Sequence, residues 1–250
     1  MSPLAFQSVY SGLAQYGPGS DMSTRKALGL LPALPGSPRV FDLGCGAGRQ
    51  TLELARELNT KIVAVDLHQS YLDELAAAAS KAGLAHLIDI RRASMDKLSE
   101  PLASIDLIWS EGAAYNIGVA RALKLWRPLL RDGGILAFTE LTWLADDPPA
   151  TAVSYWEQAY PDMTAVAGNR LKAERAGYEV LDTFPLPAED WKAYYEPLKR
   201  RIAGLRGQAG GWSDLAAVIQ SVETEIGIFE QFGDCYGYVF YILRRGPRTA

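Results

Sequence analysis

The stretch Arg39-Val-Phe-Asp-Leu-Gly-Cys-Gly-Ala-Gly48 decides how this chain folds. It begins as a short apolar run, continues through three glycines at alternating positions, and leads into the helix-like segment 50–58. A buried strand, a glycine turn and a helix open a doubly wound α/β domain, in which ligands bind at the carboxyl ends of the strands. Glycine in such a turn adopts positive φ and allows a ligand to approach the backbone closely.

The spacing of the three glycines distinguishes two kinds of ligand. A dinucleotide fingerprint reads G-x-G-x-x-G, whereas Gly44, Gly46 and Gly48 read G-x-G-x-G. Asp42 stands two positions before the first glycine, where a carboxylate suits a ligand with an ammonium group better than a pyrophosphate. The loop therefore favours a nucleotide-like ligand that presents an ammonium.

Strands alternate with helices along most of the remaining chain. This alternation implies right-handed crossovers and a largely parallel sheet. We expect an α/β fold with a doubly wound sheet of seven strands. The predicted strands are 40–43, 61–66, 87–92, 105–109, 135–142, 178–184 and 237–244.

Three parts of the chain are expected around this sheet. Residues 1–38 form an N-terminal helical cap, and residues 39–184 with 236–250 form the core. Residues 185–235 form a helical insertion between the last two strands. If the strand before it is parallel to the others, the insertion starts and ends over the ligand edge of the sheet. It is therefore a candidate lid.

Composition argues against several classes of partner. A net charge of −4 leaves no basic surplus for binding a nucleic-acid backbone. Two isolated cysteines, Cys45 and Cys235, are too few for a disulfide framework or a metal site, and they fit a reducing, cytoplasmic setting. No signal-peptide pattern or membrane-length apolar run is present, so no membrane partner is expected. We expect a monomer or a homodimer.

Two further acids follow predicted strands. Asp66 lies 22 residues after Gly44, where an acid hydrogen-bonds ribose hydroxyls in such folds; a plain surface acid is the alternative. Asp96 follows the third strand, where it would read an adenine amino group or else cap a turn. Ser94 and Met95 would line an adenine pocket through backbone N–H and apolar contact.

These motifs together resemble those of class I S-adenosylmethionine-dependent methyltransferases. The resemblance covers residues 39–142 and is carried by Asp42–Gly48, Asp66, the turn Ser94-Met-Asp96 and Gly133-Gly134. It implies a Rossmann-like methyltransferase fold with an antiparallel last strand, and S-adenosyl-L-methionine as cofactor with S-adenosyl-L-homocysteine as product. Segments 15–20, 109–118 and 236–241 resemble a group of small bacterial methyltransferases of largely unassigned substrate.

The resemblance also implies cofactor contacts. The methionine moiety would lie against the glycine loop, with Asp42 near its ammonium directly or through water, Asp66 on the ribose and Asp96 near adenine. Tyr16, in the loop 16–20, would close the site, unless that loop is only a linker. The full set of predicted cofactor contacts is Tyr16, Asp42, Gly44, Cys45, Gly46, Gly48, Asp66, Leu67, Ser94, Met95, Asp96, Ser110 and Glu111.

Other residues are candidates for the methyl acceptor. Glu111 follows the fourth strand, closest to the methyl group in this fold, where it would act as a base, hold a cationic substrate, or simply bind loop N–H groups or the cofactor. Glu140 faces the same edge, with buried structural pairing as the alternative. The predicted substrate pocket is Tyr115, Asn116, Glu140, Trp143 and Tyr195, of which Tyr195 belongs to an aromatic cluster that packs the insertion or touches substrate.

The predicted reaction is in-line methyl transfer to a small-molecule O- or N-nucleophile. A sulfonium is already an activated donor, so the protein mainly aligns the nucleophile and excludes water. The sequence Ser110-Glu-Gly-Ala113 differs from the Asn/Asp-Pro-Pro-aromatic motif of base-methylating relatives, which argues against a nucleic-acid acceptor. The alternatives are a non-catalytic S-adenosylmethionine-binding module and, less favoured by the glycine spacing, a nucleotide-binding oxidoreductase.

Overall fold

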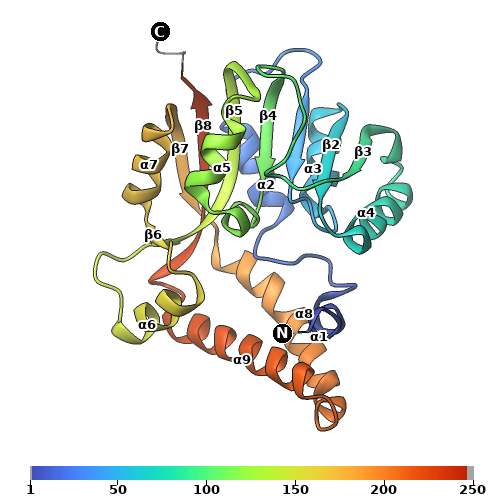
Figure 1. Cartoon of the computed structure of the whole chain (residues 1–250), viewed down its shortest axis with the longest axis vertical. Coiled ribbons are helices and arrows are strands. Elements are labelled where there is room, and N and C mark those ends of the chain that lie inside the picture. Colours follow the sequence, from blue (N-terminus) through green and yellow to red (C-terminus); the bar gives the residue numbers. More distant parts are fainter. Residues whose placement is uncertain (1, 247–250) are drawn as a thin grey trace.

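The computed structural model describes residues 2–246 and contains a mixed β-sheet with helices on both faces (Figure 1). Seven strands form the continuous sheet, in the order β3-β2-β1-β4-β5-β8-β7. Only β8 runs antiparallel to its neighbours β5 and β7, which confirms the expected fold class and the antiparallel last strand. The strands are β1 (Val40–Leu43), β2 (Ile62–Asp66), β3 (Ile88–Arg92), β4 (Ile105–Ser110), β5 (Leu130–Trp143), β7 (Tyr178–Pro185) and β8 (Tyr236–Arg245).

Two details of the sheet differ from the prediction. The strand β5 starts at Leu130, five residues earlier than predicted, because Leu130 pairs with Ile105 before a register shift between Ile105 and Leu107. A two-residue strand, β6 (Thr164–Ala165), also pairs with the end of β5. A strand of two residues is too short to show an alternation of apolar and polar side chains, so sequence periodicity cannot predict it.

The order of the strands reverses at β1. The chain runs outward from β1 to β2 and β3, and then returns to β4 on the other side of β1. In open α/β sheets this reversal leaves a crevice at the carboxyl ends of the two central strands, because the following connections diverge to opposite faces. The ends of β1 and β4 are therefore the place to look for a site.

Alternate side chains of the central strands pack against opposite helical layers. Phe41, Val63 and Leu136 face α5 (Val119–Trp126) and α7 (Val166–Arg175). The neighbouring side chains, such as Val40 and Ile62, face the other layer. Each fully buried aliphatic side chain stabilises the fold by roughly 1.5–3 kcal/mol. The second layer consists of α2 (Asp21–Gly29), α3 (Arg49–Leu58) and α4 (Gln69–Lys81).

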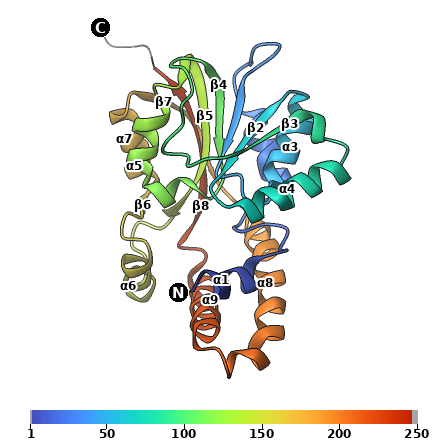
Figure 2. The same cartoon turned by 45° about the vertical axis from the view of Figure 1, so that its right-hand side comes forward.

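A further group of helices lies beyond the carboxyl ends of the strands (Figures 1 and 2). It contains α1 (Pro3–Tyr10), α6 (Ala150–Ala159), α8 (Ala188–Ala209) and α9 (Ser213–Phe232). Buried side chains at helical spacing on α9 pack with aromatic rings of α8 and with α1, forming a second core. This group spans the edge of the sheet where the strand order reverses. Among residues 2–246, no helix has the length and apolarity that crossing a bilayer requires.

Candidate functional site

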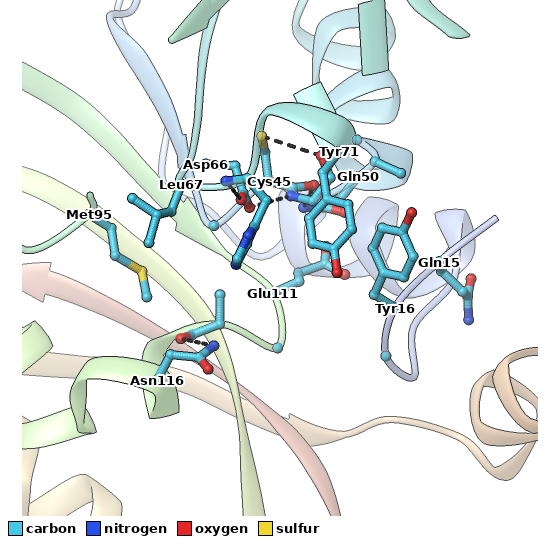
Figure 3. Close-up of a pocket in the computed structure, with 18 of the residues that line it drawn as sticks. Gln15, Tyr16, Cys45, Gln50, Asp66, Leu67, Tyr71, Met95, Glu111 and Asn116 are labelled. Carbon is cyan, nitrogen blue, oxygen red and sulfur yellow. Dashed lines mark hydrogen bonds between the residues drawn. The ribbon is translucent and has the colours of Figure 1, made fainter. Parts of the chain in front are cut away.

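A cavity of about 430 Å³ opens at the carboxyl ends of the central strands (Figure 3). Its walls come from the loop after β1, the ends of β2 and β3, the segment after β4 with its short 3-10 helix η2 (Ala114–Ile117), and the N-terminal segment. Most of the predicted site residues meet here. Those that line it are Tyr16, Gly44, Cys45, Gly46, Gly48, Asp66, Leu67, Ser94, Met95, Glu111, Tyr115 and Asn116.

The glycine loop has a geometry that only glycine fits. Gly44 has φ +74°, and a Cβ there would lie 2.3 Å from the Cβ of Ala113. Gly48 has φ +84°, and its Cβ would lie 2.1 Å from Cδ1 of Leu75. The backbone N–H groups of Gly44 and Cys45 both donate to the Val65 carbonyl, at 2.8 and 3.0 Å. The loop is thus anchored to the end of β2, and its backbone forms one wall of the cavity.

Asp66 is anchored at the end of β2 and lines the same cavity. One carboxylate oxygen accepts the backbone N–H of Gly46 at 3.0 Å, and the other accepts that of His68 at 2.9 Å. A carboxylate has about four acceptor positions, so each oxygen keeps capacity for a further donor. Asp66 and the exposed Leu67 lie side by side next to the loop in Figure 3.

Asp42 lies behind the loop rather than in the cavity wall. It is fully buried and accepts the Thr51 hydroxyl at 2.6 Å and the Gln50 amide at 3.5 Å. Burial raises the pKa of Asp42 to about 7, against the opposing effect of the Thr51 hydrogen bond. Gln50 lines the cavity, so Asp42 reaches the cavity surface through this amide.

Ser94 and Met95 line the cavity beyond β3, whereas Asp96 does not. Asp96 accepts the Ser94 hydroxyl at 2.5 Å and Arg121 at 2.7 Å. The Ser94 hydrogen bond lowers the pKa of the Asp96 carboxyl. The geometry is that of a turn-capping acid, which is the alternative to an adenine contact.

Glu111 lines the cavity after β4 with both carboxylate oxygens engaged. One oxygen accepts Arg49 at 2.5 Å, and the other accepts the Thr24 hydroxyl at 2.7 Å and the Trp109 indole N–H at 2.9 Å. These bonds tie α2, α3 and β4 together beneath the glycine loop. The preceding Ser110 is buried outside the cavity, where its hydroxyl donates to the Leu43 carbonyl at 2.8 Å.

The N-terminal segment covers one side of the cavity. The Tyr16 hydroxyl donates to Glu74 of α4 at 2.7 Å, and its ring stacks on Tyr71 with centroids 4.3 Å apart. Figure 3 shows these two rings facing each other beside Gln15. The Gln15 amide nitrogen is buried with no hydrogen-bond partner among residues 2–246, and Gln15 lines the cavity.

The predicted acceptor residues fall into two groups. Tyr115 and Asn116 line the cavity on η2. Glu140, Trp143 and Tyr195 lie outside its wall: Glu140 is buried in β5, Trp143 packs edge-on against Tyr236, and Tyr195 donates to Glu225 of α9 at 2.9 Å. Burial raises the pKa of Glu140 to about 7.

Several lining residues were not predicted. Arg49 and Gln50 immediately follow the glycine loop, so their position at the start of α3 is a signal that the sequence contains. Phe6, Tyr10, Gln15 and Tyr71 also line the cavity. Their contacts join segments far apart in the chain, for which a single sequence has no signal. Within residues 2–246, no group of three or more His, Cys, Asp and Glu side chains is arranged to hold a metal ion.

Comparison with known proteins agrees with this geometry. A family model described as a methyltransferase domain matches residues 40–134. A dimethylglycine N-methyltransferase from Parasynechococcus marenigrum (strain WH8102) is 32% identical over 122 residues, which cover 48% of this chain and 44% of that protein. A 27-O-demethylrifamycin SV methyltransferase from Amycolatopsis mediterranei (strain S699) is 24% identical over 229 residues, 89% of this chain and 82% of that protein.

Solved structures agree on the fold. A crystal structure of an S-adenosylmethionine-dependent methyltransferase from Geobacter sulfurreducens, in complex with S-adenosyl-L-homocysteine, superposes with a TM-score of 0.79 at 20% identity. The superposition covers 97% of this chain and 98% of that one, and it establishes a shared fold. Together with the glycine loop and Asp66, the methyltransferase domain matched at residues 40–134 and the shared fold support a class I S-adenosylmethionine-dependent methyltransferase.

Proposed function

We propose that the protein binds S-adenosyl-L-methionine and transfers its methyl group to an O- or N-nucleophile of a small molecule. The observation that carries this proposal is Asp66, whose two oxygens are fixed by backbone N–H groups while the side chain lines the cavity beside the glycine loop. An acid held in this way is suited to bind two neighbouring ribose hydroxyls.

The residues present fit the cofactor. Asp66 and Leu67 would hold the ribose, and Ser94 and Met95 would line the adenine site. The methionine end would lie against the backbone from Gly44 to Gly46, where added Cβ atoms would meet Ala113 and the Tyr16 ring. The unpartnered Gln15 amide is a donor that lines the cavity and is suited to the methionine carboxylate. When bound, the cofactor supplies an activated methyl group and leaves as S-adenosyl-L-homocysteine.

The protein's own part is alignment and exclusion of water. Holding two reactants in line lowers the activation barrier, typically by about 7–11 kcal/mol in well-oriented systems. Tyr16 and Tyr71 cover the cofactor side of the cavity, and the Tyr16–Glu74 hydrogen bond holds this cover in place. We propose that residues 1–38 act as a cap and residues 185–235 as a lid over the core formed by 39–184 and 236–250.

Glu111 is better suited to positioning than to proton transfer. Its oxygens already accept three hydrogen bonds, one of them from Arg49. A general base must reach the proton that it removes, whereas these bonds to Arg49, Thr24 and Trp109 fix the Glu111 carboxylate in place. Its proposed role is to hold Arg49, and with it the start of α3, under the glycine loop.

The acceptor class follows from the site and the relatives. The names of the two relatives indicate an amine nitrogen in one case and an oxygen in the other, so either nucleophile is compatible with the family. A partly enclosed cavity suits a small molecule better than a polymer. The free thiols of Cys45 and Cys235 fit a reducing, cytoplasmic setting.

Calorimetry with S-adenosylmethionine, S-adenosylhomocysteine and NAD tests the cofactor. We expect both adenosyl ligands to bind and NAD not to bind; tight NAD binding without a response to the sulfonium would support an oxidoreductase. Turnover is then tested with methyl-labelled S-adenosylmethionine and a metabolite extract. Labelled product supports the enzyme, whereas binding without product from any fraction would support a non-catalytic binding module.

A further inference from the structure

A second acidic region lies next to the cavity and plays no part in the cofactor contacts. Glu140 on β5 is only 1% exposed, and both of its carboxylate oxygens lack a hydrogen-bond partner among residues 2–246. Buried polar atoms in native proteins are nearly always paired, so each unpaired one needs an explanation. No described cation forms an ion pair with this carboxylate, so its oxygens remain available to a partner from outside the chain.

The groups around Glu140 do not neutralise it. The Tyr160 hydroxyl lies near the carboxylate without a hydrogen bond of normal length. The charge of Lys172 acts on Glu140, but the Lys172 ammonium donates to the Asp162 carbonyl at 3.2 Å. Asp162 itself adds a like charge. The titratable groups that face Glu140 are Tyr115 of η2, Tyr160 and Asp162 after α6, Lys172 of α7, and Tyr238 and Tyr241 of β8.

A second acid, Glu225 of α9, is surrounded by tyrosines. It accepts the Tyr195 hydroxyl at 2.9 Å and has no ion-pair partner among residues 2–246. Burial and then the charge of Glu225 raise the pKa values of Tyr10 and Tyr155. The Tyr236 hydroxyl and the Trp156 indole N–H are also buried in this cluster without a hydrogen-bond partner of normal length.

Tyr115 connects both acids with the cavity. It is 41% exposed and lines the cavity wall, and its ring meets that of Tyr160 edge-on with centroids 5.9 Å apart. Burial, and then the charges of Glu225 and Glu140, raise the pKa of Tyr115. Tyr115 therefore lies in the cavity wall and in the field of both carboxylates.

We infer that the cavity takes a cationic amine against the ring of Tyr115, with the buried carboxylates of Glu140 and Glu225 behind that ring balancing its charge. Aromatic faces attract cations, most strongly where water is excluded. A buried carboxylate without a partner is costly, and a bound cation would remove that cost. The same two charges would repel a carboxylate or phenolate acceptor. This inference rests on the proposed function and names its acceptor class.

The charge balance of the reaction fits an amine better than an oxygen acceptor. A bound ammonium first gives up a proton to water, and the lone pair of the neutral amine then forms the new N–C bond while the S–C bond breaks and its electron pair stays on sulfur. The positive charge thus moves from sulfur to nitrogen, toward Glu140 and Glu225. If the nitrogen carries a hydrogen, that proton then leaves to water, and a tertiary amine leaves as a quaternary ammonium. Two acids at the acceptor end stabilise the charge where it develops.

The test uses ligands of one shape and different charge. Calorimetry on the full chain, with and without saturating S-adenosylhomocysteine, would measure tetramethylammonium, choline and 3,3-dimethylbutan-1-ol, in which carbon replaces the choline nitrogen. We expect a cation to bind at least roughly ten-fold more tightly than the uncharged isostere. Equal affinities, or no binding of either cation, would overturn the inference. S-adenosylhomocysteine is titrated separately. If the proposed function is wrong, that titration shows no binding, and the affinities of the cations can still be compared with that of the uncharged isostere.

Variants identify the residues. Glu140→Gln and Glu225→Gln keep shape and remove charge, and each should weaken choline binding roughly ten-fold while leaving the affinity for S-adenosylhomocysteine unchanged. Tyr115→Phe should retain choline affinity, whereas Tyr115→Leu should lose it. Glu230→Gln on the exposed face of α9 is the matched control, because Glu230 pairs with Lys199 away from the cavity. Unchanged choline affinity in both Glu140→Gln and Glu225→Gln would contradict the inference even if one of them folds poorly.

Discussion

The acids at the cofactor end of the site and the acids behind Tyr115 differ in their hydrogen bonding. At the cofactor end, Asp66 is bonded by two backbone N–H groups and Glu111 by an arginine, a hydroxyl and an indole. Near the acceptor end, Glu140 has no hydrogen-bond partner among residues 2–246, and Glu225 has a tyrosine. The hydrogen bonds of Asp66 and Glu111 fix these two side chains in position. The Glu140 carboxyl, which lacks such bonds within the described part of the chain, stays available to a positively charged partner.

This difference connects to how each end is built. The cofactor end consists mainly of short segments that directly follow β1, β2, β3 and β4, so the parallel sheet itself brings them together. The acceptor end combines η2, β5, the segment after α6 and α9, which meet only through tertiary packing. The first end is therefore rigidly specified, and the second depends on how the outer helices pack.

The largest expected effect is at the glycine loop. Gly44→Ala places a Cβ 2.3 Å from the Cβ of Ala113 at a φ of +74°, so the loop must move away from the end of β2. We expect S-adenosylhomocysteine binding to be lost in calorimetry. Gly204→Ala in α8 is the control, because nothing lies within 4 Å of its added Cβ; similar losses in both variants would mean that the loop geometry is not what binds the ligand.

The next effect concerns stability and pH at the acceptor end. The folded protein holds Glu140 with a pKa of about 7, above its ordinary value. The protonated carboxyl therefore favours folding at low pH, and this contribution is lost as pH rises through about 7. Glu140→Gln stays neutral, so it should be more stable than the parent at pH about 8, by a margin on the order of 3 kcal/mol.

Urea unfolding at acidic and mildly alkaline pH checks this prediction. The parent retains a further pH dependence from Asp42, whose pKa is also raised to about 7 by burial. The slope of unfolding free energy against pH should therefore shrink in Glu140→Gln without vanishing. Glu179→Gln, at an exposed acid that pairs with Arg244, is the control. Equal slopes in both variants would show that Glu140 does not titrate in this range.

Asp66→Ala probes the ordered cofactor end. Its carboxylate would lose hydrogen bonds to the ribose, so affinity for S-adenosylhomocysteine should fall by about 1–3 kcal/mol, or roughly 5- to 150-fold. Asp89→Ala, on the neighbouring strand and outside the cavity, is the control for removing an acid from this region. An Asp66 variant with parental affinity would remove the observation on which the proposed function depends.

Glu111→Gln is expected to have the smallest effect. The amide keeps the shape but weakens the contact with Arg49, so cofactor affinity should fall by about 3- to 10-fold while kcat stays nearly unchanged. Glu57→Gln, an exposed position on the same helix as Arg49, is the control. A large loss of kcat at parental cofactor affinity would instead make Glu111 a general base. Stopped assays at saturating cofactor separate the two outcomes.

The sequence by itself determined the sheet and the cofactor end of the site. Alternating apolar strands and helices predict a doubly wound sheet, and parallel strands bring their carboxyl ends to one edge whatever the surrounding packing. Gly44, Gly48 and Asp66 need only their own strand ends to be in place, so local spacing was enough to predict that they lie at one cavity. Asp42 and Asp96 show the limit of this reasoning, because the same spacing places them near the loop but cannot tell whether they face the cavity.

Only the tertiary structure decided the partners of each acid and the composition of the acceptor end. The Glu111–Arg49 pair joins residues 62 positions apart, and Tyr195 meets Glu225 across the hairpin of α8 and α9. Tyr16 stacks on Tyr71 because α4 and the N-terminal segment lie side by side. Such contacts depend on how helices pack across a folded surface, and packing between distant segments leaves no periodic trace in one sequence.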